Sequence, residues 1–380
     1  MKIQQHHFVQ DKWLEKSSDT NFNTNNAQLV FALGAGQLIS DKEVFDYLKN
    51  IYPNANIVGA STSGEIINDD VVDESVVVTA IEFEKTKVKC AETNIKNQQN
   101  SFEAGKHLMQ ELNADDIVAV FIISDGTKIN GSELVNGMNE NNDKKIPITG
   151  GLAGDAARFG KTYVGLNHTP TEGNVLAIGF YGKHLKIGHG SFGGWDEFGR
   201  ERIITKSDKN ILYEIDGKNA LDLYKEYLGP YAQELPGSAL LFPLSIKIEN
   251  DESTLVRTIL SIDENNKSMT FAGNLPEGSK VRLMKANFEK LIEASSTAAE
   301  QSLDNHAIPP QLAILISCVG RRLLLQERSY EEVQAAKKIF GNKTNITGFY
   351  SYGEISPYNQ NAFCGLHNQT MTITTFTETI

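Results

Sequence analysis

Short apolar runs alternate with amphipathic segments along most of the chain. The run Leu29–Leu33 ends at a glycine, which is typical of a buried strand followed by a turn. Ser40 then opens a segment with apolar residues on one helical face, and Pro53 ends it. Two further apolar, β-branched runs, Ile57–Val58 and Val76–Phe83, follow as strands. This order predicts a strand–helix–strand unit.

The same order of elements recurs twice later in the chain. In the middle, Ile117–Ile123 and Ile146–Thr149 are predicted strands, and a helix between them starts near Gly131. Near the end, the strand Leu312–Ser317 precedes a helix over Tyr330–Phe340. Strands that alternate with helices predict an α/β class, with right-handed crossovers where the strands are parallel.

A ten-residue motif supports a repeated architecture. Ile57–Ile66 (IVGASTSGEI) and Ile346–Ile355 (ITGFYSYGEI) are identical at five of ten positions. A shorter version, ITGGLAGD, begins at Ile148. In each copy a valine in the preceding amphipathic segment lies thirteen residues before the first isoleucine: Val44, Val135 and Val333. The chain is therefore predicted to be a two-half protein built from repeated strand–helix–strand units with mixed sheets.

The remaining segments complete the predicted organisation. Residues 1–26 are polar and rich in Asn and Ser, so we expect an irregular lead-in. Residues 204–303 are predicted to hold a strand pair, a helix over Ala220–Leu228, two strands around the acidic turn Asn250–Glu252, and a long helix. We place the boundary between the halves near residue 215, which gives segments 27–215 and 216–380.

The net charge and the cysteine content of the chain limit the partners and the compartment that we expect for it. The net charge is −12 and the pI is about 5.2, which disfavours nucleic acid and anionic membranes. The apolar runs are too short to span a bilayer. The three cysteines, Cys90, Cys318 and Cys364, are widely spaced and odd in number, which favours reduced thiols. We therefore expect a cytoplasmic protein.

Several of these motifs together resemble the FIST family. The motif Gly348–Ile355 and the stretch Leu366–Thr372 (LHNQTMT) are similar to its C-terminal half, as is Ser317–Arg322 (SCVGRR). Ile57–Ile66 and Gly150–Asp155 resemble motifs of its N-terminal half. The resemblance runs from about residue 27 to the end, so 27–215 would be the FIST N-type domain and 216–380 the FIST C-type domain.

The resemblance implies a sensory domain that binds a small ligand inside the cell. Amino acids or their derivatives are the ligands proposed for the family, and some members are haem proteins that sense nitric oxide. Relatives are often fused to histidine kinase or diguanylate cyclase modules. Nothing here resembles such a module, so signalling would pass through a separate partner protein.

Carboxylates recur at the glycine-rich tips of the repeats. Glu65 and Glu354 follow glycines after a predicted strand, and Asp155 does so in the middle copy. Sites in α/β proteins commonly lie beyond the carboxyl ends of strands, where a carboxylate can hold a ligand ammonium group. Alternatively, each carboxylate serves the local structure, as most loop carboxylates do.

Arg321 and Arg322 form the only Arg-Arg pair in the chain. A guanidinium group there could hold a ligand carboxylate through two hydrogen bonds. The alternative is an ion pair with Glu327 or Glu354. With Arg321 or Arg322 on a carboxylate and Glu354 on an amine, an amino acid would be the natural ligand.

Other polar side chains complete the predicted binding site. Tyr350 and Tyr352 flank the late tip and offer apolar area with a polar end, while Ser63 lies at the corresponding place in the first copy. Asn368 can donate and accept hydrogen bonds. Packing or loop fixation explains each of these residues equally well.

Two other functions stay open as alternatives. A haem-based nitric oxide sensor would use one histidine as the iron ligand, and His189 and His367 are the best placed. A hydrolase or transferase lacks support, because Gly59–Ser63 is not the GxSxG motif and Cys318 is better explained as a buried thiol. We therefore expect a non-enzymatic protein without a resident cofactor or metal.

Overall fold

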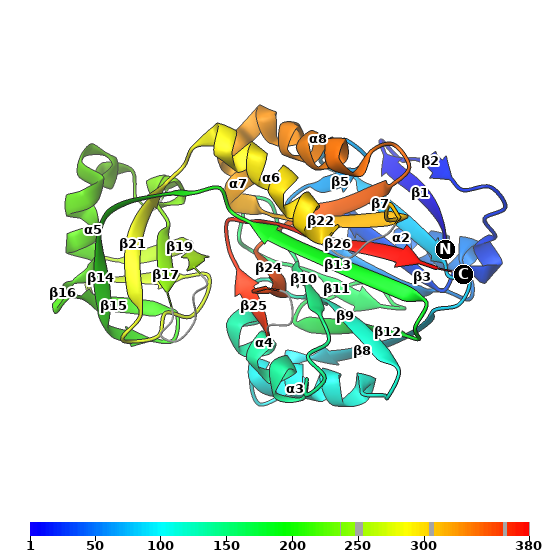
Figure 1. Ribbon diagram of the computed structural model, residues 1–380, viewed down its shortest axis with the longest axis horizontal. Helices are drawn as coiled ribbons and strands as arrows, with labels where there is room; N and C mark the ends of the chain where they lie inside the picture. The colour runs from blue at the N-terminus through cyan, green and yellow to red at the C-terminus, as the bar shows by residue number, and fades with distance from the viewer. Residues whose placement is uncertain (236, 248–253, 304–307, 360–362, 380) are drawn as a thin grey trace.

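The computed structural model describes residues 1–235, 237–247, 254–303, 308–359 and 363–379. Within these ranges the strands form three six-stranded sheets and one eight-stranded sheet. The α/β class with mixed sheets is confirmed. Figure 1 shows a body that holds the three six-stranded sheets and, at its left end, a smaller lobe that holds the fourth.

The three sheets of the body contain these strands in spatial order. Sheet one is β11 (Val164–Leu166), β4 (Asn56–Ser61), β3 (Leu29–Gly34), β7 (Val76–Glu82), β1 (Lys2–Val9) and β2 (Lys12–Ser18). Sheet two is β25 (Cys364–His367), β24 (Gly353–Pro357), β10 (Ile148–Leu152), β9 (Ile117–Ser124), β12 (Asn174–Tyr181) and β8 (Lys87–Asn94). Sheet three is β6 (Asp70–Val72), β5 (Glu65–Ile67), β23 (Asn345–Ser351), β22 (Leu312–Cys318), β26 (Met371–Glu378) and β13 (Leu185–Phe192).

Each of the three body sheets contains one strand–helix–strand unit. The units are β3–α2–β4, β9–α4–β10 and β22–α8–β23, with parallel strand pairs and with helices α2 (Lys42–Ile51), α4 (Gly131–Glu140) and α8 (Ser329–Phe340). After each unit the chain crosses to another sheet: β5 pairs with β23, β11 with β4, and β24 with β10. The three sheets are thereby joined in a cycle.

Period-two alternation of apolar side chains builds the core of the body. Phe31 and Phe121 face inward, and together with residues of sheet three they form one core shared by all three sheets. Their neighbours Val30 and Val120 face the opposite way, toward the helices. Helices α3 (Ser101–Leu112) and α4 cover sheet two, and α6 (Phe288–Ser302) and α8 cover sheet three on the opposite side of the body (Figure 1).

The smaller lobe has a hydrophobic core of its own. It contains β14 (Asp196–Asp208), β15 (Ile211–Ile215), β16 (Lys218–Asn219), α5 (Ala220–Leu228), β17 (Leu244–Lys247), β18 (Thr254–Arg257), β19 (Ile259–Asp263), β20 (Ser268–Phe271) and β21 (Lys280–Lys285). We call these elements the outer lobe. The predicted boundary near residue 215 falls inside it, so both predicted halves contribute strands to the lobe. The predicted acidic turn over Asn250–Glu252 lies outside the described residues.

The prediction of an irregular lead-in over residues 1–26 is wrong. Strands β1 and β2 form a hairpin, and β1 pairs along its length with β7. The inward positions of β1 include Gln5 and His7, so the alternation that marks a strand is hidden by polar residues. The Gln5 amide donates to Thr79 Oγ1 at 3.2 Å and to the Ile346 carbonyl at 3.0 Å, which satisfies it and joins two sheets.

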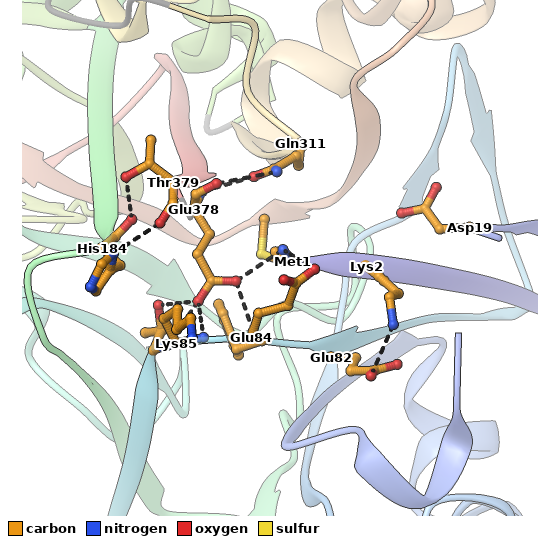
Figure 2. A network of polar contacts seen from close by, with 12 residues as sticks. Met1, Lys2, Asp19, Glu82, Glu84, Lys85, His184, Gln311, Glu378 and Thr379 are labelled. Atoms are coloured by element: carbon orange, nitrogen blue, oxygen red, sulfur yellow. Dashed lines mark hydrogen bonds and ion pairs between the residues drawn. The ribbon is translucent and has the colours of Figure 1, made fainter. Parts of the chain in front are cut away.

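Glu378, near the end of β26, ties three parts of the body together (Figure 2). Its carboxylate accepts hydrogen bonds from the amides of Glu84, Lys85 and Thr86, which lie just after β7. The amino group of Met1 lies 2.9 Å from the same carboxylate. Burial opposes ionisation, but these donors outweigh it and lower the pKa of Glu378 to about 2.

Candidate functional site

The three glycine-rich tips meet one another where β4, β10 and β23 end. They are Ser61–Glu65, Leu152–Asp155 and Tyr350–Glu354. The Ser63 amide donates to the Tyr350 carbonyl at 2.8 Å, and the Tyr352 amide donates to the Leu152 carbonyl at 3.3 Å. The Gly154 amide donates to the Ser61 carbonyl at 2.9 Å. Equivalent atoms of the three copies therefore form a cyclic set of hydrogen bonds, which we call the tip ring.

The tip glutamates point into the protein and bond to their own surroundings. Glu65 accepts from the hydroxyls of Thr62 at 2.5 Å and Ser75 at 2.7 Å. Glu354 accepts from the Ser351 hydroxyl at 2.8 Å and from the amide and hydroxyl of Thr370. Burial raises the pKa of both carboxyls to about 8. Both residues therefore hold the turns that follow β4 and β23.

Arg321 is fully buried, and its donors are used within the protein. Its guanidinium pairs with Glu332 at 2.7 Å and donates to the carbonyls of Gly193 and Leu291. Glu332 also accepts from the hydroxyl of Tyr350 at 2.8 Å. Arg321 and Tyr350 thus belong to a buried polar network, not to a cavity wall.

Arg322 and Ser63 line a second, open cavity of about 660 Å³. Arg322 pairs with Asp73, donates to the Ser63 carbonyl, and lies over the Tyr350 ring at 5.2 Å from its centroid. In the middle tip, Asp155 accepts from the Arg158 side chain three residues later, at 2.8 Å from Nε. These contacts occupy the charged groups that were expected to bind a ligand.

A cleft of about 590 Å³ separates the third tip from the outer lobe. Its body wall lies beyond the carboxyl ends of β9, β10, β22 and β23, which is where ligand sites in α/β proteins commonly lie. Two predicted residues line it, Tyr352 and Asn368. The other lining residues are Gly126, Thr127, Lys128, Ile129, Asn130, Leu152, Phe159, Cys318, Val319 and Gly320 from the body, and Asn210, Gly237, Leu240, Thr258, Ile259, Leu260, Phe271 and Ala272 from the lobe.

The Asn368 side chain is the most unusual group in the cleft wall. The residue is 1% exposed, and neither its amide oxygen nor its amide nitrogen has a hydrogen-bond partner among the described residues. On the lobe side, the Thr258 hydroxyl is also buried without a described partner. Leaving a buried polar group unpaired costs about 1–3 kcal/mol, so such groups in a cavity wall mark a place where a ligand can compensate.

Aromatic rings form another part of the body wall. Phe159 stacks on Tyr352 with ring centroids 4.7 Å apart and an angle of 18°. The Tyr352 hydroxyl accepts from the Phe159 amide at 3.0 Å, which fixes the loop that carries Phe159. The outer face of Phe159 stays accessible, because this side chain is 45% exposed.

Two cations lie in or behind the cleft wall. Lys128 lines the cleft and pairs with Glu172 at 2.5 Å. Arg257 is buried beside Thr258. Its guanidinium donates to the carbonyls of Leu366 at 3.1 Å and Asn274 at 3.1 Å. Arg257 therefore links the outer lobe to the body at Leu366, two residues before Asn368.

The two histidines proposed for haem line neither the cleft nor the second cavity. His367 Nε2 lies 3.0 Å from the Ser356 carbonyl, and burial lowers its pKa to about 4. Burial also lowers the pKa of His189. Within the described ranges, no group of three His, Cys, Asp or Glu side chains could hold a metal ion.

Groups with nucleophilic potential are held in unreactive surroundings. Cys318 reaches the cleft wall, but burial raises the pKa of its thiol far above the ordinary value. The Ser61 hydroxyl is fully buried and accepts from the Tyr163 amide at 2.9 Å. The sequence could not reveal Lys128, Phe159 or Thr258 as cleft residues, because the lobe and body that enclose them are distant in sequence.

Family models match most of the chain. The FIST N domain matches residues 28–218, and the FIST C domain matches residues 220–357. The chain belongs to the FIST family. FIST domains are a family of sensory domains, so the FIST assignment supports small-ligand sensing as the general role. No helix in the described part of this FIST protein is long and apolar enough to cross a membrane.

Similar proteins add little about the ligand. An uncharacterized protein of Methanocaldococcus jannaschii is 25% identical over 355 residues, which cover 82% of this chain and 66% of that protein. This FIST chain thus spans just under two thirds of that relative. A cyanuric acid hydrolase from A. caulinodans aligns over the whole of both chains with a TM-score of 0.41 and 7% identity. A likeness at that level supports no conclusion about activity.

Proposed function

We propose that this FIST protein is a non-enzymatic, intracellular sensor that binds a small polar metabolite in the cleft between the body and the outer lobe. The observation that carries the proposal is the Asn368 amide, which is buried in the cleft wall with both polar atoms unpaired. A ligand that satisfies this amide recovers the free energy lost by leaving it unpaired. The unreactive surroundings of Cys318 and Ser61 support binding without turnover.

Signalling would follow from the position of the cleft. A ligand that bonds to Asn368 on the body and to Thr258 on the lobe would favour the arrangement of body and lobe in which both side chains contact the ligand. The ligand then shifts the equilibrium between this arrangement and the ligand-free one by its differential affinity for the two. A separate histidine kinase or diguanylate cyclase would read the change. The free thiols of Cys90, Cys318 and Cys364 fit the proposed reducing, cytoplasmic location.

A thermal-shift screen of amino acids, their derivatives and other small polar metabolites tests this function. A ligand that binds only the folded state raises the apparent melting temperature. We expect Asn368→Leu to abolish the shift caused by a hit, and Asn265→Leu, at an exposed lobe position, to preserve it. A hit whose shift survives both Asn368→Leu and Thr258→Val would show that the cleft is not the binding site. Haemin in the same screen tests the haem alternative through its absorption spectrum.

A further inference from the structure

The cleft has an unusual balance of charge for an amino-acid site. Among the described residues that line it, none is Asp or Glu, and Lys128 is the only charged side chain. Arg257 adds a second positive charge behind the wall. A ligand ammonium group in this cleft would lose its hydration and gain no carboxylate partner among the described lining residues, which is unfavourable.

The Asn368 amide defines what a ligand must present. An asparagine side chain offers one acceptor oxygen and an NH₂ donor side by side. Both are unpaired here, so the complementary group is a donor and an acceptor at the same spacing. Asparagine pairs in this two-point way with the edge of a base such as adenine. Primary carboxamides, lactams and imides carry the same kind of edge.

The neighbouring walls indicate the shape of the ligand. The accessible face of Phe159, backed by Tyr352, suits a flat ring, because offset stacking is the favoured contact between aromatic systems. Ile259, Leu260 and Phe271 on the lobe side provide apolar surface. Asn368 and Thr258 line the same cleft, from the body side and from the lobe side.

We propose that the ligand of this cleft is a planar lactam, imide or aromatic carboxamide that lacks an ammonium group. Its amide edge pairs with Asn368, and its ring stacks on Phe159. This inference rests on the proposed function, since it names the ligand class of the same cleft. It departs from an amino-acid ligand, whose ammonium group has no counterpart among the described lining residues.

Calorimetric titration with matched probes tests the ligand class. The probes are uracil and benzamide, with 1,3-dimethyluracil and N,N-dimethylbenzamide as analogues that lack the N–H donor, and phenylalanine as an ammonium-bearing ring. We expect uracil or benzamide to bind, and its methylated analogue and phenylalanine to bind at least about tenfold more weakly.

Variants locate the interaction. Asn368→Asp keeps the shape of the side chain but replaces the donor by a second acceptor, so we expect at least about tenfold weaker binding of the unmethylated probe. Phe159→Leu, at an exposed position that contributes little to the core, should also weaken binding, and Asn265→Asp should leave it unchanged. The Phe159→Leu result remains decisive if Asn368→Asp fails to fold.

The outcomes separate the two proposals. Equal binding of the methylated and unmethylated probes, or binding unaffected by Asn368→Asp and Phe159→Leu, overturns the ligand class. If phenylalanine or another amino acid binds with dependence on Asn368 while uracil and benzamide do not, the ligand class is wrong and the cleft remains the sensor site. If no probe and no metabolite binds, both proposals fall.

Discussion

The Ser63 amide donates a hydrogen bond to the Tyr350 carbonyl at 2.8 Å, although the two residues belong to opposite ends of the chain. The same bond recurs between the equivalent atoms of the other tips and closes the tip ring. The recurring glycine-carboxylate motif thus serves assembly, because each tip is the hydrogen-bonding partner of another. The accessible ligand cleft lies on the outer side of the third tip, where Tyr352 and Asn368 face the outer lobe.

Because the three tips pack closely in the tip ring, adding one methyl group at Gly154 should clearly lower the stability of the protein. A Cβ atom on Gly154 would lie 2.8 Å from the Ser63 amide nitrogen, which the backbone must move to accommodate. We expect Gly154→Ala to lower the free energy of unfolding by about 1–3 kcal/mol, as overpacking commonly does. Urea denaturation monitored by circular dichroism measures the change.

Gly237 provides the matched control. A Cβ atom there meets nothing within 4 Å, and its φ lies outside the left-handed region. Gly237→Ala should therefore change stability by less than about 1 kcal/mol, in either direction. Equal stability of Gly154→Ala and the unaltered protein would show that the tips do not pack as tightly as described.

The buried network around Glu332 predicts that Arg321 matters for stability and not for ligand recognition. Arg321→Met leaves Glu332 buried without its 2.7 Å cationic partner. Breaking a buried pair in this way costs about 3–5 kcal/mol. Arg328→Met, which removes exposed pairs with Glu289 and Glu331, should cost about 0–1 kcal/mol. Loss of ligand affinity in folded Arg321→Met, without loss of stability, would contradict this assignment.

The buried tip glutamates predict that the protein loses stability as the pH rises toward 8. The folded protein holds Glu354 protonated up to its raised pKa of about 8, while an unfolded chain ionises near the ordinary value of 4.5. Unfolding therefore releases a proton between these values, and the contribution of this group to stability falls as the pH rises from about 4.5 to 8. Glu65 contributes in the same direction.

Glu354→Gln removes the ionisation while an amide can still bond with Ser351 and Thr370. Relative to the unaltered protein, we expect the variant to gain stability between pH 6 and pH 9, by up to a few kcal/mol, since each pKa unit is worth about 1.4 kcal/mol. Denaturation midpoints at pH 6 and at pH 9 measure the gain in stability. Glu43→Gln, at an exposed site, should show no such dependence, and a pH-independent difference for Glu354→Gln would refute the raised pKa.

The predictable part of the fold follows from local patterns. The run Leu29–Leu33 became β3 and the segment after Asp41 became α2, because an apolar strand and a capped amphipathic helix are both encoded within a few residues. The hairpin β1–β2 escaped prediction because Gln5 and His7 are polar residues at buried positions of β1, and Gln5 bonds to a residue on a distant strand. Burial of a polar residue depends on tertiary contacts that no local pattern reveals.

The candidate site was predictable only in part, for a related reason. Tyr352 and Asn368 could be chosen from their tip and loop positions, and both line the cleft. Arg321 looked like a ligand-binding residue, but its partner Glu332 lies on the next helix and neutralises it in the core. Thr258 belongs to the outer lobe and could not be placed opposite Asn368 without knowing how the lobe docks on the body.

The carboxylate of Glu378 predicts an opposite, acidic limit to stability. Its pKa of about 2 in the folded protein lies below the ordinary 4.5, so its contribution is fully present above pH 4.5 and is lost as the pH falls toward 2. The donors responsible are the amides after β7 and the Met1 amino group, which Figure 2 shows converging on the side chain.

Glu378→Gln tests this limit because it removes the charge and retains the shape. We expect it to lower the free energy of unfolding at pH 7 by on the order of 3 kcal/mol, because the pKa of Glu378 is lowered from 4.5 to about 2 and each pKa unit is worth about 1.4 kcal/mol. The deficit should shrink steadily as the pH falls from about 4.5 toward 2, as measured by urea denaturation across that range. Glu84→Gln is the matched control, because that carboxylate is more exposed and lies 3.7 Å from the Met1 amino group. A deficit for Glu378→Gln that stays constant down to pH 2 would show that lost packing, and not lost charge, accounts for the change.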